Sequence, residues 1–174
     1  ERGVVHRDIK PDNILLSGHT AVVADFGIAK AIAAAQEKPV GETLTQLGTA
    51  VGTPAYMAPE QAAGDPDTDH RADLYAFGCM AYELLAGQPP FAGLPPHKLF
   101  AAHMNETPRD VRELRPDCPA PLAALVMHCL AKNPGDRPQH ADDVLRELDA
   151  ASSLSSGPAI GAFAYGRSFF LPAM

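Results

Sequence analysis

The sequence predicts an α+β chain that is mainly α-helical and carries a short β-hairpin near its N-terminus. In the second half of the chain, apolar residues recur three and four positions apart, which is the spacing of amphipathic or buried helices. Near the start, two short apolar runs are separated by a polar, glycine-containing stretch that favours a hairpin turn. Apolar residues make up 46% of the 174 residues and charged residues 20%, which is ordinary for a globular domain.

The expected hairpin consists of Ile14–Leu16 and Ala21–Ala24, joined by a turn at Ser17–Thr20. An earlier apolar run, Gly3–Val5, predicts one more short strand. A two-stranded ribbon of this length is marginal in water and needs something to pack on. Residues 28–57 follow and are rich in Ala, Gly and Thr without periodicity, which is typical of a long functional loop.

Four helices are expected after this loop. The first begins after Asp69, which can cap it, and ends near Ala86. Its apolar residues cover almost every face, so we expect it to be buried at the centre of the fold. The other three helices are expected over Pro96–Met104, Ala120–Ala131 and Asp142–Ala151. Residues 152–174 open with a serine-rich stretch and are expected to form a linker-like tail.

Three short motifs follow one another along the chain: HRDIKPDN at residues 6–13, DFG at residues 25–27 and APE at residues 58–60. Two more follow them, DLYAFG at residues 73–78 and NPGDRP at residues 133–138. In this order the motifs resemble those of bacterial Ser/Thr protein kinases of the eukaryotic-like (Hanks) type, over residues 1 to about 150. The resemblance implies a protein-kinase-like fold. Within that fold, this chain would be the mainly α-helical C-terminal lobe with the hairpin at the active site.

The resemblance also implies chemical roles for individual residues. Asp8 would accept the proton of a substrate hydroxyl, and Lys10 would neutralise the transferring phosphate. Asn13 and Asp25 would hold Mg²⁺, with Mn²⁺ as an alternative, because amide and carboxylate oxygens suit hard cations. Thr53 would contact the catalytic loop and shape the substrate pocket. Lys10, two residues after Asp8, is typical of Ser/Thr kinases rather than tyrosine kinases.

A second set of residues is expected to support the site structurally. Asp73 lies inside the apolar helix and should accept hydrogen bonds, because an unpaired buried carboxylate is costly; the resemblance implies that the donors are backbone N–H groups of the catalytic loop. Glu60 and Arg137 match a family ion pair that ties the loop to the helices. The remaining supporting residues are His6, Arg7 and Phe26.

Regulation by phosphorylation is also expected. Arg7 precedes Asp8, an arrangement that allows a phosphorylated loop residue to pair with a guanidinium. The candidate phosphorylation sites are Thr43, Thr45 and Thr49, and Thr45 best matches the position used by related bacterial kinases. The alternative is that these threonines are simply polar loop residues.

The implied activity is transfer of the γ-phosphoryl group of ATP to Ser or Thr hydroxyls of protein substrates. The glycine-rich loop that would cover the ATP phosphates does not occur in this sequence. We therefore expect residues 1–151 to be a partial kinase domain that is inactive alone and leaves an apolar strip of its central helix uncovered. The alternative is a non-catalytic module that binds another kinase chain or a substrate, or a fragment without function.

The composition of the chain argues against a nucleic-acid partner and against a membrane-spanning segment. The formal net charge is −7 and no basic block occurs, so a nucleic-acid partner is not expected. No apolar run reaches the roughly 18 residues of a membrane span. We expect this chain in the cytoplasm, with membrane anchoring of a parent kinase left open. Cys79, Cys118 and Cys129 form no Cys-x-x-Cys pair and are expected to be reduced thiols.

Overall fold

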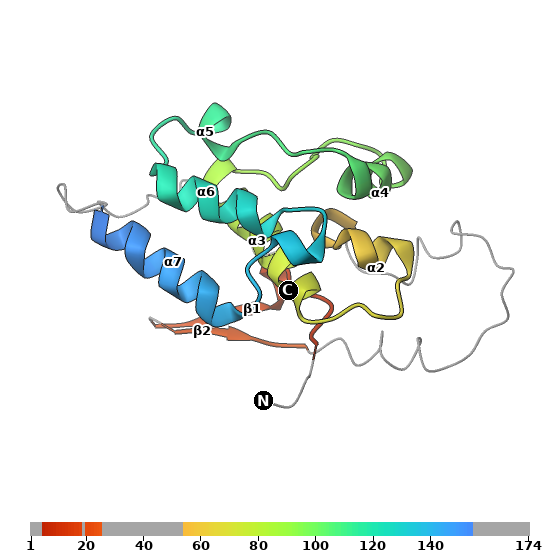
Figure 1. Cartoon of the computed structure of the whole chain (residues 1–174), viewed down its shortest axis with the longest axis horizontal. Coiled ribbons are helices and arrows are strands. Elements are labelled where there is room, and N and C mark those ends of the chain that lie inside the picture. Colours follow the sequence, from red (N-terminus) through yellow and green to blue (C-terminus); the bar gives the residue numbers. More distant parts are fainter. Residues whose placement is uncertain (1–4, 19, 26–53, 155–174) are drawn as a thin grey trace, which may run out of the picture.

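The computed structural model describes residues 5–18, 20–25 and 54–154. These residues form one antiparallel hairpin followed by six α-helices, as Figure 1 shows. The strands are β1 (Ile14–Ser17) and β2 (Thr20–Val23). The α-helices are α2 (Pro59–Ala63), α3 (Arg71–Ala86), α4 (Pro96–Asn105), α5 (Val111–Leu114), α6 (Ala120–Cys129) and α7 (Ala141–Leu154). Short 3₁₀ turns stand at Pro11–Asn13, Pro54–Tyr56 and Pro134–Asp136.

Helix α3 runs through the middle of the described structure and packs against α2, α5 and α6 (Figure 1). Ala72, Tyr75 and Cys79 on α3 have no exposed surface. The helix is therefore buried, as its apolar residues predict. It begins at Arg71 with His70 as the N-cap residue, so Asp69 is not the cap that was expected, although its carboxylate accepts the Arg71 N–H at 2.9 Å.

The expectation of an uncovered apolar strip along α3 is confirmed in part. Half of the apolar side chains of α3 are buried, whereas Phe77, Met80 and Ala81 on one face are half-buried and Leu84, further along that face, is 53% exposed. Helices α5 and α6 pack on faces of α3, and the periodicity of the sequence could not predict which helices would pack there. Apolar side chains are also exposed on the hairpin, where Leu16 is 80% and Leu15 57% exposed.

The hairpin pairs Ile14 with Val23 and Ser17 with Thr20, close to the expected register. Every residue of β2 is exposed. The expected strand at Gly3–Val5 falls mostly outside the described residues, and Val5 itself is not in a strand.

Two short helices and one helix end differ from the sequence-based expectations. Helices α2 and α5 were not expected, because neither is long enough to show a periodic pattern. Helix α7 continues to Leu154, so residues 152–154 belong to a helix rather than to the expected linker. The Ser153 hydroxyl donates to the Asp149 carbonyl at 2.8 Å, which satisfies a polar side chain within the helix.

The three cysteines are buried and free of disulfide bonds, as expected. Burial raises the pKa of the Cys79 thiol, and it raises that of Cys129 to about 12. These thiols are protonated at neutral pH and act as small apolar core residues.

Candidate active site

The segment before the hairpin is anchored on α3 through Asp73. Its two carboxylate oxygens accept the backbone N–H groups of His6 and Arg7, each at 2.7 Å. Burial raises the pKa of Asp73, and the two N–H donors oppose that rise because they stabilise the charged form. The expected contact between this carboxylate and the backbone of the segment before the hairpin is therefore present.

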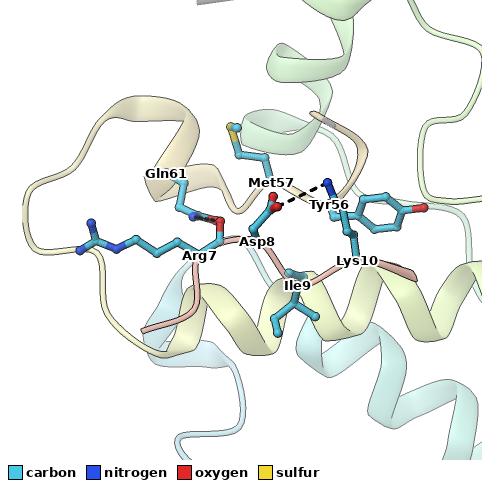
Figure 2. Close-up of a pocket in the computed structure, with 8 residues that line it drawn as sticks. Arg7, Asp8, Ile9, Lys10, Tyr56, Met57 and Gln61 are labelled. Atoms are coloured by element: carbon cyan, nitrogen blue, oxygen red, sulfur yellow. Dashed lines mark hydrogen bonds and ion pairs between the residues drawn. The ribbon is translucent and has the colours of Figure 1, made fainter. Parts of the chain in front are cut away.

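Arg7 adopts a left-handed backbone conformation, with φ of 64°. A residue with a side chain rarely adopts this conformation unless its surroundings hold it there. The Asp73 bond to Arg7 N–H supplies part of that restraint. This turn aims the side chain of Asp8 away from α3, toward the open side of the segment (Figure 2).

The Asp8 carboxylate lies next to a cation and an amide. Lys10 Nζ is 3.4 Å from Asp8 Oδ2, and both side chains are about one fifth exposed. Asn13 Nδ2 donates to the same Oδ2 at 3.1 Å and to the Asp8 carbonyl at 2.7 Å. Figure 2 shows the carboxylate and the lysine facing each other at the mouth of a small pocket. The carboxylate is thus oriented by two donors while it stays accessible.

Asn13 and Asp25 are brought to one end of the hairpin. Asn13 is buried and its carbonyl accepts the Ala24 N–H at 2.8 Å. His6 Nε2 lies 3.1 Å from the Ala24 carbonyl, so this histidine ties the end of β2 to the segment that carries Asp8. Asp25 follows with φ of 55° and is exposed. The hairpin thus positions the two residues that were expected to hold a metal ion.

The donor set suits Mg²⁺, since Asn13 offers an amide oxygen and Asp25 a carboxylate. Among the described residues, no group of three or more His, Cys, Asp or Glu side chains could hold a metal alone. Mg²⁺ commonly takes one or two protein ligands and completes its shell with water and substrate phosphates. The two residues therefore fit that ion better than they fit a closed zinc or calcium site.

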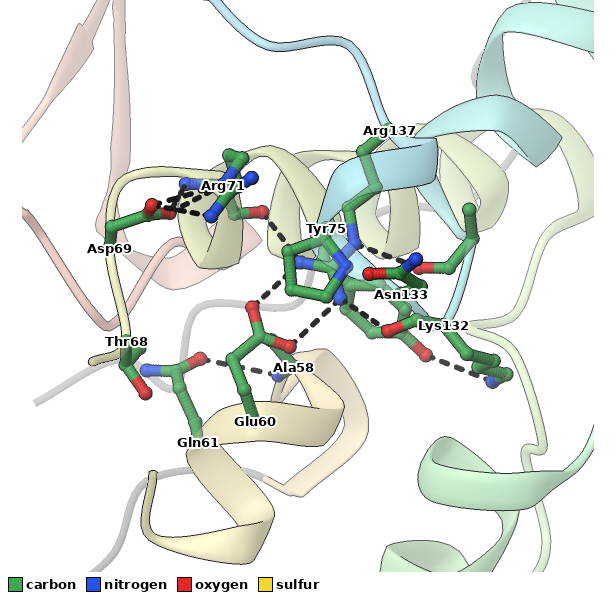
Figure 3. A network of polar contacts seen from close by, with 12 residues as sticks. Ala58, Glu60, Gln61, Thr68, Asp69, Arg71, Tyr75, Lys132, Asn133 and Arg137 are labelled. Carbon is green, nitrogen blue, oxygen red and sulfur yellow. Dashed lines mark hydrogen bonds and ion pairs between the residues drawn. The ribbon is translucent and has the colours of Figure 1, made fainter. Parts of the chain in front are cut away.

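Glu60 and Arg137 form a buried bidentate ion pair, as expected (Figure 3). The two bonds are 2.7 and 2.8 Å long, and the Arg137 side chain has no exposed surface. The guanidinium also donates to the carbonyls of Ala131, Arg71 and Lys132. Its remaining face stacks on the Tyr75 ring, with 4.9 Å between Cζ and the ring centroid. This pair fastens α2, which starts the segment after residue 58, to the helical core.

Several contributors to the site were not expected. Tyr56 donates to Glu83 Oε2 at 2.5 Å, and Gln61 contacts the Arg7 carbonyl. No pattern in the sequence marks Gln61 or Glu83, because each gains its partner only through the fold. The small pocket beside the carboxylate is lined by Arg7, Asp8, Ile9, Lys10, Tyr56, Met57, Gln61 and Ala76.

Some expected site residues lie outside the described residues. They are Phe26, the candidate phosphorylation sites Thr43, Thr45 and Thr49, and the substrate-pocket residue Thr53.

Residues 1–148 match the family model described as "Protein kinase domain". The chain belongs to the protein kinase family. It is 42% identical over 149 residues to the serine/threonine-protein kinase PknB of Mycobacterium tuberculosis, covering 85% of this chain and 23% of that protein. It is 39% identical over 168 residues to a probable serine/threonine-protein kinase of Streptomyces coelicolor, covering 94% of this chain and 24% of that protein.

A probable serine/threonine-protein kinase of Corynebacterium efficiens is 38% identical over 157 residues. The protein kinase family to which the chain belongs generally uses ATP and Mg²⁺ and acts on protein substrates. The chain spans about a quarter of the length of these relatives. Within residues 5–18, 20–25 and 54–154, none of the helices has the length and apolar character needed to cross a membrane.

Proposed function

We propose that this chain carries the catalytic loop of a Ser/Thr protein kinase, which transfers the γ-phosphoryl group of ATP to Ser or Thr hydroxyls. In this proposal the described residues belong to the C-terminal lobe of the kinase domain. The observation that carries it is the Asp8 carboxylate, held at the pocket mouth between Lys10 at 3.4 Å and Asn13 at 3.1 Å. A carboxylate so placed can orient and deprotonate a hydroxyl.

The chemistry assigns one task to each residue. The substrate hydroxyl oxygen forms a bond to the γ-phosphorus while the bond to the β,γ-bridging oxygen breaks and ADP leaves. Asp8 receives the hydroxyl proton. The Lys10 ammonium offsets negative charge on the phosphoryl oxygens. Asn13 and Asp25 would hold Mg²⁺, which supplies charge neutralisation at the ATP phosphates when it is bound.

The test of this assignment is substitution of Asp8. The chain joined to the nucleotide-binding lobe of a related kinase should phosphorylate a Ser/Thr protein substrate with Mg-ATP. Asp8→Asn should lower that rate on the order of 10²–10⁴-fold, since it removes the proton acceptor. Asp12→Asn is the matched control, because Asp12 is exposed in the same segment. An undiminished rate in the Asp8→Asn protein would remove Asp8 from the mechanism.

The proposed metal role of Asp25 has its own test. Asp25→Asn should raise the Mg²⁺ concentration required for half-maximal rate, because a neutral amide binds a hard cation more weakly than a carboxylate does. A Mg²⁺ titration of the rate measures this. An unchanged Mg²⁺ dependence would exclude Asp25 as a ligand.

Regulation is proposed at Thr45, with Thr43 and Thr49 as alternatives and Arg7 as the cation that would receive the phosphate. Thr53 is proposed to shape the substrate pocket. Mass spectrometry of the active fusion should locate phosphate between Thr43 and Thr49. Full activity without phosphate in that interval would remove the proposed switch.

Non-catalytic binding is a second candidate function, and the exposed hairpin favours it. Leu15, Leu16, Val22 and Val23 are each 39–80% exposed, and apolar side chains gathered on one small element commonly mark a contact surface. In this candidate the chain binds another kinase chain through the hairpin. Phosphoryl transfer by the chain joined to a nucleotide-binding lobe separates the two candidates, because only the catalytic candidate predicts that this fusion phosphorylates a substrate.

A further inference from the structure

Gln61 links two segments that carry different parts of the proposed active site. It stands in the first turn of α2, directly after Glu60. Its Oε1 accepts the Ala58 N–H at 3.2 Å, and its Nε2 donates to the Arg7 carbonyl at 3.3 Å. A single side chain therefore joins the start of α2 to the residue that precedes Asp8. Figure 2 shows Gln61 reaching the backbone of this segment beside the pocket.

The Arg7 carbonyl belongs to the peptide group that joins Arg7 to Asp8. The other end of the same peptide group is the Asp8 N–H, which donates to His6 Nδ1 at 3.3 Å. Because a peptide group is planar, contacts at both ends determine how the whole plane is rotated. The rotation of this plane determines the backbone torsion at Asp8, and that torsion sets the direction in which the Asp8 side chain leaves the backbone.

This peptide group follows a residue in an uncommon conformation. Arg7 has φ of 64°, and Asp73 holds its N–H at 2.7 Å. Asp73 restrains the N-terminal side of Arg7, whereas Gln61 restrains its carbonyl side. A strained backbone of this kind persists only where several contacts determine it together. The contact from Gln61 comes from α2.

Helix α2 is itself fixed to the core. Glu60, the residue before Gln61, is bound by both terminal nitrogens of Arg137. Arg137 thus fixes the position of α2 through Glu60, and α2 in turn contacts the peptide group before Asp8 through Gln61.

We propose that Gln61 is a positioning residue that aligns Asp8 by orienting the Arg7–Asp8 peptide group according to the position of α2. The effect of Gln61 on catalysis rests on the proposed kinase function. Its effect on the orientation of the Arg7–Asp8 peptide group does not. In this proposal, residues 54–63 control the alignment of Asp8, the proposed proton acceptor, through the side-chain amide of Gln61.

Two substitutions separate the bonds of Gln61. Gln61→Glu keeps an acceptor for Ala58 N–H but cannot donate to the Arg7 carbonyl, and it places a carboxylate oxygen against that carbonyl. Gln61→Met keeps the length of the side chain and removes both bonds. Gln88→Glu is the matched control, because Gln88 is exposed in the turn after α3 and receives the same change in charge.

The first readout is amide hydrogen exchange of the full chain by mass spectrometry. Gln61→Glu and Gln61→Met should each speed exchange about tenfold in peptides covering residues 5–13, with exchange in α6 unchanged. Gln88→Glu should match the parent chain. Unchanged exchange over residues 5–13 in both Gln61 variants would overturn the proposal.

The second readout is kinetic and uses the chain joined to a nucleotide-binding lobe. Gln61→Glu should lower kcat about tenfold and leave KM for ATP and for substrate unchanged, because only the alignment of Asp8 changes. If Gln61 had a purely structural role, Gln61→Glu would lower thermal stability without lowering kcat at constant KM. An unchanged kcat would overturn the positioning role. If the parent fusion shows no phosphoryl transfer, the proposed function fails, and the exchange experiment alone decides whether Gln61 orients the segment.

Discussion

At the scale of single residues, His103 is a buried polar side chain whose two ring nitrogens have different surroundings. His103 on α4 has no exposed surface, and its Nδ1 lies 2.8 Å from the Tyr75 hydroxyl. Lys132 Nζ donates to the same hydroxyl at 3.3 Å, so the hydroxyl hydrogen is directed to His103. His103 is therefore neutral, with its hydrogen on Nε2. That nitrogen lies near the backbone of Ala55 but makes no hydrogen bond of good geometry among the described residues.

His103 predicts a loss of stability in mild acid. Burial, followed by the nearby Lys132 cation, lowers the pKa of His103 from 6.5 to about 4. The unfolded chain therefore gains a proton between pH 6.5 and about 4 that the folded chain does not. The contribution of neutral His103 to the free energy of unfolding is therefore fully present above pH 6.5. It decreases as the pH falls toward 4, by about 3 kcal/mol at most. The raised pKa of Asp73 acts in the opposite direction.

Urea unfolding at a series of pH values from 7 to 4 measures this loss. His103→Gln should flatten the curve, because glutamine does not titrate and can still accept from Tyr75. His97→Gln is the control, since His97 is exposed on the same helix. An equal acid loss in His103→Gln and in the parent chain would exclude His103 as its source.

At the scale of elements, the fold depends on close packing at two places. Helices α3 and α6 cross at Gly78, where an added Cβ would lie 2.8 Å from Cys129 Cβ. Real Cβ atoms do not approach so closely, so only glycine allows this crossing. Helix α2 is held in a different way, by the Glu60–Arg137 ion pair and the three carbonyls that Arg137 also binds.

Gly78→Ala should destabilise the chain. Replacing Gly by Ala in an exposed helix interior stabilises by about 1 kcal/mol, but overpacking at this crossing should cost roughly 1–3 kcal/mol, so the net loss should be up to about 2 kcal/mol. Thermal and urea unfolding measure the change. The double variant with Cys129→Gly removes the opposing Cβ, so the two effects should not add. Strict additivity would mean that the two residues do not compete for the same space.

Arg137→Leu should cost about 3–5 kcal/mol, because it leaves the nearly buried Glu60 carboxylate without its cation. Arg146→Leu is the control, since the Arg146 side chain is 72% exposed in its own ion pair and should contribute about 0–1 kcal/mol. Urea unfolding of both variants measures the difference. Similar losses in the two proteins would contradict the structural role of the buried pair.

At the scale of the whole molecule, apolar surface is unevenly distributed. The helical part leaves single large apolar side chains exposed, such as Leu84 and Leu145, whereas the hairpin exposes several side by side, with Leu16 at 80% and Leu15 at 57%. A two-stranded ribbon gains little stability from its own contacts and usually packs on another surface. The hairpin is therefore the part of the described structure best suited to contact another chain.

The isolated chain should self-associate through this hairpin. Leu16→Glu should shift the molecular mass measured by light scattering toward the monomer, because a charge on the ribbon disfavours apolar contact. Leu145→Glu is the control, since Leu145 on α7 is 58% exposed but lies outside the hairpin. A parent chain that is monomeric at all concentrations, or an equal shift in both variants, would contradict this prediction.

Much of the fold and of the candidate site was predictable from local patterns. The hairpin and the buried central helix follow from periodicity and turn residues, and so do the helices expected over residues 96–104, 120–131 and 142–151, which the structure has over 96–105, 120–129 and 141–154. The motifs predict roles for Asp8, Asn13 and Asp25, which stay predictions, whereas the expected partners of Asp73, Glu60 and Arg137 are present in the structure. Helices α2 and α5 were missed because a few residues cannot show a period.

The sequence by itself determined the family and the residue types at the candidate site, because contiguous motifs carry that information within a few positions. Only the tertiary structure decided what surrounds them: Gln61 on the Arg7 carbonyl, Tyr75 between His103 and Lys132, and Cys129 against Gly78. It also decided that the most exposed apolar side chain, Leu16, lies on the hairpin and not on α3. The physical reason is that such contacts join residues far apart along the chain, and their geometry arises only when the helices pack together.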